Sequence, residues 1–211
     1  MAHVLIIGAS QGIGLATVRA ALKQGHHVRA LARTASRIPI TDERLEKVVG
    51  DTLREGDVVQ ALSGVDAVVQ ALGIPVQDLF RPVTLFSEAT QVLVQAMEAA
   101  GISRLIAVTG FGAGDSRAAI GLLQLLPFQI VFGRAYDDKD VQEMMIRKSR
   151  LAWTIVRPGI LTDSTRASGY TVLDEPASWR GGFISRSAVA DFLVRQIEDR
   201  QYVGRTPALI Q

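Results

Sequence analysis

Short apolar runs alternate with amphipathic segments along most of the chain. Residues 4–7 form a continuous apolar run, which is typical of a strand buried on both faces of a parallel sheet. Similar runs predict five more strands, at 27–32, 46–49, 67–71, 105–108 and 153–156. Helical spacing predicts helices at 16–22, 57–62, 86–100, 137–149 and 187–198, the last with Ser187 as its N-cap. This alternation predicts an α/β fold, a Rossmann-type doubly wound parallel sheet forming one domain over residues 1–211.

A glycine-rich turn follows the first predicted strand. It reads Gly8-Ala9-Ser10-Gln11-Gly12-Ile13-Gly14 and stands directly before a helix. Glycines at these spacings permit a tight turn, let backbone amides approach a pyrophosphate and let the helix pack closely on the strand. The helix N-terminus adds unpaired N–H groups and partial positive charge. We expect a dinucleotide site here that uses Gly8, Ser10, Gln11, Gly12, Ile13 and Gly14. The alternative is a turn that only joins two elements.

The residues after the second predicted strand indicate which dinucleotide binds. NAD-binding chains usually place an acidic residue here to hold the ribose hydroxyls, but the first carboxylate in this chain is Asp42. Arg33 and Arg37, with the Ser10 hydroxyl, could instead hold a 2′-phosphate through charge-assisted hydrogen bonds. We therefore expect NADP(H) rather than NAD(H), the alternative being two solvated arginines on a loop.

Composition and charge exclude several classes of protein. The 23 lysines and arginines nearly balance 21 aspartates and glutamates, so we expect no nucleic-acid binding through bulk electrostatics. Cysteine is absent, which excludes disulfides, thiolate catalysis and zinc–sulfur sites, and the three histidines lack the spacing of a metal site. The longest uncharged stretch, 118–133, is shorter than the ~20 apolar residues that a spanning helix needs. With no secretion signal at the start, we expect a cytoplasmic monomer or homodimer without a transmembrane segment.

Four motifs, in chain order, resemble the short-chain dehydrogenase/reductase superfamily from about residue 4 to residue 198. They are Gly8-x-x-x-Gly12-x-Gly14, Gly50-Asp51, Asp66-Ala-Val-Val-Gln-Ala-Leu-Gly73 and Thr154-Ile-Val-Arg-Pro-Gly159. They are most similar to its atypical, NAD(P)H-binding branch, which includes the NmrA-like regulators and the biliverdin reductase B/flavin reductase group. Three further segments also resemble that reductase group: Arg33-x-x-x-Arg37, Gly169-Tyr-Thr-Val172 and Ile184-Ser-Arg186.

The resemblance implies the rest of the cofactor site. It places Asp51 and Thr52 at the adenine, and Ala71, Leu72 and Gly73 under the adenine ribose. It places Thr109 and Lys139 at the nicotinamide ribose, and the segment from Pro158 to Ile160 along the nicotinamide pocket. Without the resemblance, Asp51 is equally well a helix cap and Pro158 a strand terminator.

The candidate proton-transfer residues depart from the superfamily pattern. The tyrosine-dependent branch uses Tyr-x-x-x-Lys, but Ala135 stands four residues before Lys139. Tyr136 is one position later, which rotates its side chain by ~100° around a helix. Lys139, Tyr136 and Thr109 are the candidate catalytic residues, and we favour Lys139 as a ribose ligand rather than a proton donor. A solvated helix lysine beside three aspartates is the alternative.

Two further positions of the proton-transfer set also differ. The superfamily's serine corresponds best to Gly110, and a histidine of the reductase group is replaced by Gly159. We therefore expect hydride transfer to a small apolar or aromatic acceptor, such as a flavin or quinone, because solvent can supply the proton. The alternative is a non-catalytic NADP(H)-binding redox sensor of the NmrA-like kind. A sugar-nucleotide epimerase is disfavoured, because that chemistry needs the missing tyrosine.

Two segments, 110–135 and 157–185, remain for a small substrate region. The apolar stretch 118–132 is expected to be a loop above the nicotinamide, at the carboxyl edge of the sheet. It would form the wall of an apolar pocket, pack on its own domain or make a dimer contact. Arg134, Arg157 and Arg166 are candidates for holding an anionic substrate, although surface arginines are commoner.

Overall fold

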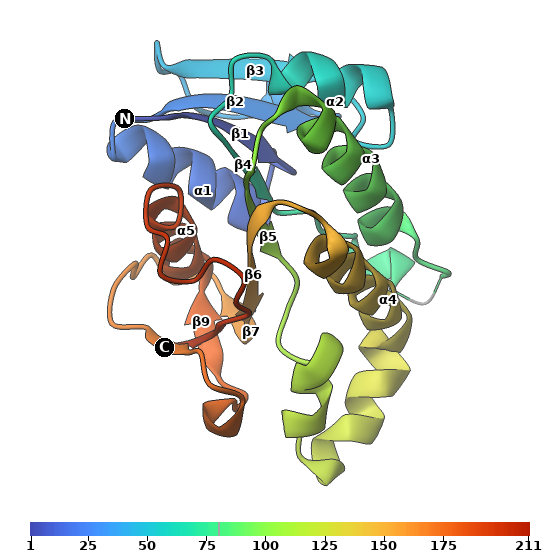
Figure 1. Ribbon diagram of the computed structural model, residues 1–211. Helices are drawn as coiled ribbons and strands as arrows, with labels where there is room; N and C mark the ends of the chain where they lie inside the picture. Colours follow the sequence, from blue (N-terminus) through green and yellow to red (C-terminus); the bar gives the residue numbers. More distant parts are fainter. Residues whose placement is uncertain (80) are drawn as a thin grey trace.

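Parallel strands form the centre of the molecule, and the computed structural model describes residues 1–79 and 81–211. The strands of the main sheet are β1 His3–Ile7, β2 His27–Ala32, β3 Leu45–Val49, β4 Ala67–Gln70, β5 Arg104–Val108, β6 Ala152–Pro158, β8 Thr171–Leu173 and β10 Ala208–Ile210. Their order is β3-β2-β1-β4-β5-β6-β10-β8, with only β8 antiparallel to its neighbour (Figure 1). The order of connection reverses between β1 and β4, and folds of this kind bind ligands at the carboxyl ends of the strands there.

Helices cover both faces of the sheet (Figure 1). α1 Gly12–Lys23 and α5 Arg186–Arg195 pack together on one face. α2 Glu55–Leu62, α3 Leu85–Ala100 and α4 Leu122–Lys148 pack in a row on the other. Shorter elements lie in the connections: β7 Ile160–Thr162 and β9 Phe183–Ser185 form a small parallel sheet, and the 3-10 turns are η1 Ala35–Arg37, η2 Val76–Asp78, η3 Gly114–Ala119 and η4 Pro176–Ser178.

Strand β1 shows why the apolar runs predict buried strands. Successive side chains of a strand point to opposite faces, so Val4 and Ile6 join the core under α1 and α5. Leu5 and Ile7 join the separate core under α2 and α3. All four are almost fully buried. The predicted doubly wound parallel sheet is therefore confirmed.

The expectation of a loop over 118–132 is wrong for most of that stretch. Helix α4 begins at Leu122, fifteen residues before the predicted start at 137, and it runs to Lys148. The residues from 122 to 132 are rich in leucine, which favours a helix, and contain no glycine. Pro127 is the one residue among them that strongly disfavours a helix, and α4 continues through it. The first turns of α4 extend beyond the sheet beside η3 (Figure 1). In the part of the chain that the structure describes, no helix is long and apolar enough to cross a membrane.

The last helix has a different cap from the predicted one. The residue at the N-cap of α5 is Ser185, whose Oγ accepts a hydrogen bond from the Ala188 amide at 3.1 Å, so Ser187 lies inside the helix. The same Ser185 hydroxyl donates to the carbonyl of Arg166 and thereby ties the preceding loop to the helix.

Candidate functional site

In the glycine turn after β1, two of the three glycine positions have no room for a side chain. Gly8 has a φ of +80°, and a Cβ there would lie 2.5 Å from the carbonyl oxygen of Ala71. A Cβ at Gly14 would overlap the carbonyl oxygen of Gly8, so α1 can start against β1 only with glycine at this position. Gly12 differs: its φ is +58° and no atom lies within 4 Å of where its Cβ would be. The turn is therefore tightly packed beneath and open above Gly12, as a pyrophosphate site requires.

The start of α1 is free to bind an anion. Its N-cap, Gln11, makes no capping hydrogen bond through its side chain, and the first turn contains no acidic residue. Gln11 and Gly12 are exposed, and Ser10 and Ile13 are half-buried. The partial positive charge of the helix N-terminus is therefore not neutralised by the described residues around it.

Arg33 and Arg37 follow β2, next to the glycine turn. The Gly8 amide donates to the carbonyl of Leu31 at 3.1 Å, which fixes the turn beside the end of β2. Both arginines are exposed, and neither guanidinium has a hydrogen bond or ion pair within residues 1–79 and 81–211. Asp42, the next carboxylate along the chain, is paired with Arg44 at 3.1 Å. The geometry therefore leaves both guanidinium groups available to a phosphate.

The residues expected at the adenine lie after β3. Asp51 is not a helix cap: its amide donates to Asp57 Oδ2 at 2.7 Å, and the N-cap of α2 is Arg54. Thr52 is 8% exposed, and its buried Oγ1 has no hydrogen-bond partner among the described residues. A buried hydroxyl without a partner costs free energy, so Thr52 is suited to contact a ligand.

The segment after β4 packs against the glycine turn. Ala71 donates its amide to the carbonyl of Ile7 at 3.0 Å, which holds this segment beside the glycine turn. Ala71 and Leu72 are half-buried, and Gly73 is exposed with open space around it. The preceding residue, Gln70, is fully buried and bonds to Thr90 on α3, a link that sequence reasoning missed.

The three candidate catalytic residues converge at the carboxyl end of β5. Lys139 donates a hydrogen bond from Nζ to the carbonyl oxygen of Thr109. The same Nζ lies 4.9 Å from the centre of the Phe86 ring and 5.2 Å from that of Tyr136. The one-residue offset therefore does not separate Tyr136 from Lys139. Lys139 is half-buried between these groups, so it is not a solvated helix lysine.

Tyr136 occupies the space of the side chain at position 110. A Cβ on Gly110 would overlap the hydroxyl oxygen of Tyr136, which explains why glycine replaces the serine of the superfamily here. Burial raises the pKa of Tyr136 to about 12. Burial also lowers the pKa of Lys139 to about 8, although Glu143 and Asp138 act to raise it. The lysine thus lies over the tyrosine ring without lowering the pKa of its hydroxyl.

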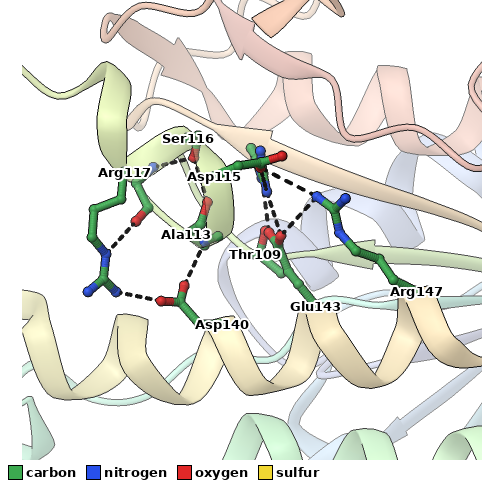
Figure 2. Close-up of polar contacts among 11 residues, drawn as sticks. Thr109, Ala113, Asp115, Ser116, Arg117, Asp140, Glu143 and Arg147 are labelled. Atoms are coloured by element: carbon green, nitrogen blue, oxygen red, sulfur yellow. Dashed lines mark hydrogen bonds and ion pairs between the residues drawn. The ribbon is translucent and has the colours of Figure 1, made fainter.

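The aspartates next to Lys139 have structural partners. Asp138 Oδ2 accepts a hydrogen bond from the Phe86 amide at 2.8 Å, near the start of α3. Asp140 accepts from the Gly114 amide at 2.6 Å and pairs with Arg117 at 2.9 Å (Figure 2). These contacts fix α4 against α3 and η3, and they leave Lys139 as the charged residue of this turn that faces β5.

Arg157 is not a surface arginine that could bind an anionic substrate. It is 0% exposed, and its Nε and Nη2 donate to the carboxylate of Glu143 at 2.9 and 2.5 Å. Nη2 also pairs with Asp115 at 2.6 Å, so the guanidinium is already held by two carboxylates. The other two arginine candidates, Arg134 and Arg166, are both exposed.

The segment after β6 presents apolar side chains. The carbonyl of Pro158, which is buried, accepts a hydrogen bond from the Phe111 amide at 2.9 Å. A Cβ on Gly159 would overlap the carbonyl oxygen of Gly182, so no histidine or other side chain fits there. Ile160 pairs with Phe183 across the β7–β9 sheet, and they are 63% and 61% exposed. This pair forms an apolar surface at the carboxyl end of β6.

Comparisons with known sequences show the family to which the chain belongs. The NAD(P)H-binding family matches residues 8–200. Protein TIC 62, chloroplastic, from Oryza sativa subsp. japonica is 30% identical over 214 residues, which cover 90% of this chain and 42% of that protein. The 3-diazoavenalumate denitrifying reductase of Streptomyces sp is 37% identical over 114 residues, covering 50% of this chain and 36% of that protein. The chain thus spans about two-fifths of the TIC 62 protein.

Solved structures share the fold. A short-chain dehydrogenase/reductase from Veillonella parvula DSM 2008, in complex with NADP, superposes with a TM-score of 0.85 at 19% identity, covering 100% of this chain and 94% of that one. ChuY, an anaerobillin reductase from Escherichia coli O157:H7, superposes with a TM-score of 0.80 at 24% identity, covering 99% and 96%. Because the family match runs from the glycine turn to beyond α5, the chain belongs to the NAD(P)H-binding family.

Proposed function

We propose that the protein is an NADP(H)-dependent reductase that passes a hydride to a conjugated acceptor such as a flavin or quinone. The observation that carries this proposal is the contact of Lys139 with Thr109 beside a tyrosine whose pKa is raised to about 12. This arrangement suits a residue that holds the nicotinamide ribose, but it lacks a tuned proton donor. Acceptors that take their proton from solvent tolerate that lack.

Each of the groups at the carboxyl ends of the strands has a role in this proposal. The open amides of the turn at Gly12 bind the pyrophosphate, and Arg33 and Arg37 bind the 2′-phosphate. The Thr52 hydroxyl contacts the adenine, and Lys139 uses its remaining N–H groups on the nicotinamide ribose. When bound, NADPH supplies the hydride from C4 of its nicotinamide ring.

The acceptor would lie between the two substrate segments, 110–135 and 157–185. Ile160 and Phe183 offer an exposed apolar surface from one segment. Phe132 offers another, and its ring packs edge-on against Tyr136 with centroids 6.3 Å apart. Flat, apolar acceptors suit such walls. We further propose that the protein acts in the cytoplasm, as a monomer or homodimer.

A redox sensor that binds NADP(H) without turnover is the second candidate, because it is also compatible with a site lacking a tuned proton donor. Steady-state oxidation of NADPH in the presence of flavins, quinones and simple carbonyls separates the two. The reductase predicts turnover with a flavin or quinone and little with the carbonyls. Tight NADPH binding with no oxidation by any acceptor would favour the sensor.

A further inference from the structure

A buried carboxylate, Glu143, lies one helical turn after Lys139 and holds the same residue that Lys139 contacts. Glu143 is 2% exposed, and its Oε1 accepts a hydrogen bond from the Thr109 hydroxyl at 2.8 Å. The Thr109 carbonyl accepts from Lys139. The hydroxyl and the carbonyl of Thr109 therefore contact two different residues of α4. Figure 2 shows the contact of Thr109 with Glu143, so the hydroxyl is not directed at a substrate.

Arg157 fixes the carboxylate from the opposite side. Its Nε and Nη2 bond to the two oxygens of Glu143 at 2.9 and 2.5 Å, as a planar guanidinium can do with a carboxylate. The guanidinium also lies 4.9 Å from the centre of the Trp179 ring, near η4. Neither charge is exposed, so the orientation of Glu143 is set by the protein and not by water.

The loop that follows β5 packs directly on this ion pair. A Cβ on Gly114 would lie 2.6 Å from both Arg157 Nη2 and Glu143 Oε2. The next residue, Asp115, pairs with Arg157 at 2.6 Å. Burial acts to raise the pKa of Asp115, but the Arg157 guanidinium holds it below its usual value. One buried pair thus joins β5, η3, α4 and β6 at the carboxyl edge of the sheet.

We propose that Glu143, held by Arg157, is a positioning residue that sets the place and the charge of Lys139 through Thr109. This inference rests on the proposed function, because it assigns Lys139 to the nicotinamide ribose. A buried ion pair adds little net stability compared with apolar residues, so a purely structural reason for the pair is weak. A negative charge fixed near a half-buried lysine favours the protonated form of that lysine.

The charges that act on Lys139 are few. Glu143 and Asp138 on α4 both raise its pKa, against the larger effect of burial. The groups that face its Nζ from other elements do not titrate: the Thr109 carbonyl, just after β5, and the Phe86 ring on α3. Removal of the Glu143 charge should therefore lower the pKa of Lys139 from about 8.

The test is a titration of Lys139 by NMR in protein labelled at lysine side chains and free of cofactor. The chain has four lysines, Lys23, Lys47, Lys139 and Lys148, so few signals need to be resolved, and a Lys139→Arg variant assigns the relevant one. We expect Glu143→Gln to lower the pKa of Lys139 by about one pH unit. The matched control is Glu98→Gln, which removes a carboxylate paired with Arg150 at the surface and should leave that pKa unchanged.

Two substitutions of Thr109 keep the test decisive if Glu143→Gln does not fold. Thr109→Val keeps the shape and removes only the hydroxyl that reaches Glu143, so it should lower the pKa of Lys139 by a smaller amount. Thr109→Ser, which keeps the hydroxyl, should leave the pKa of Lys139 at its wild-type value. An unchanged Lys139 pKa in folded Glu143→Gln, or in Thr109→Val, would overturn the positioning role.

The pH profile of kcat/KM for NADPH gives a second readout. Because only protonated Lys139 makes a charge-assisted hydrogen bond to the ribose, activity should fall above its pKa, and Glu143→Gln should move this basic limb to lower pH. A purely structural role would lower activity at every pH without moving the limb. Absence of NADPH oxidation in the wild type would contradict the proposed function alone, because the titration without cofactor still tests the positioning role.

Discussion

The Cα of Gly14 lies against the carbonyl oxygen of Gly8, so closely that a Cβ at position 14 would overlap that oxygen. This contact joins the start of α1 to the end of β1 and shapes the turn that would hold the pyrophosphate. Gly56, on α2, carries no such restriction, because no atom lies within 4 Å of where its Cβ would be. The two positions therefore form a matched pair for substitution by alanine.

We predict that Gly14→Ala destabilises the protein by about 2 kcal/mol or more, because the turn must shift to admit the methyl group. NADPH binding should weaken as well. Gly56→Ala should stabilise the protein by about 0.5 kcal/mol, since alanine is the better helix former. Urea denaturation of both variants measures the difference. Equal stabilities of the two variants would show that the turn can accommodate a methyl group at position 14.

We predict that Arg33→Ala and Arg37→Ala each raise the Kd for NADPH about tenfold and leave the Kd for NADH unchanged. A charge-assisted hydrogen bond to the 2′-phosphate is worth about 1.5–3 kcal/mol, and NADH has no such phosphate. Arg19→Ala, which removes an exposed arginine from α1, is the control. Titration of both nucleotides by fluorescence checks this. If NADH binds wild type as tightly as NADPH, the assignment of both arginines is wrong.

We predict that Tyr136→Phe retains activity with a flavin or quinone to within about threefold, whereas Lys139→Met loses about 10- to 100-fold in kcat/KM. The tyrosine has a raised pKa and is not needed as an acid, but the lysine would hold the ribose. General acid catalysis is worth about 10²–10⁴-fold. A loss of that size in Tyr136→Phe would therefore mean that the acceptor is a carbonyl compound protonated by Tyr136.

We predict that Ser185→Ala destabilises the protein by about 1–2 kcal/mol, because it removes the side-chain cap of α5. Ser187→Ala should change stability by less than about 0.5 kcal/mol. Thermal and urea unfolding of the two variants provide the comparison. The reverse order would mean that Ser187 is the cap, as the sequence alone indicates.

The central strands could be predicted because each is an apolar run long enough to be recognised. The strand at 27–32 has the predicted bounds, and the others differ by one or two residues at their ends. Strands of three residues, such as β8 and β10, could not be predicted, because so short a run has no readable period. The start of α4 was missed because an uninterrupted apolar run without alternation fits a loop, a strand or a helix equally well.

The glycine turn could be predicted from local spacing, but the buried ion pair beside Thr109 could not. Glu143 and Arg157 are 14 residues apart, on a helix and a strand, and only tertiary packing brings them together. An arginine before Pro158 is by itself more often a surface residue. The overlap of Tyr136 with the side-chain space at Gly110 is likewise a contact between distant segments, and no pattern in the sequence indicates it.

The most direct test of the account is a single turnover under anaerobic conditions, with the protein in excess over NADPH and a flavin or quinone present. The account predicts that NADPH is oxidised as the acceptor is reduced, and that NADPH deuterated at the transferred position of C4 reacts several-fold more slowly. It also predicts a slower reaction in Lys139→Met. NADPH that binds tightly and persists unchanged with every flavin and quinone would contradict the assignment as a reductase.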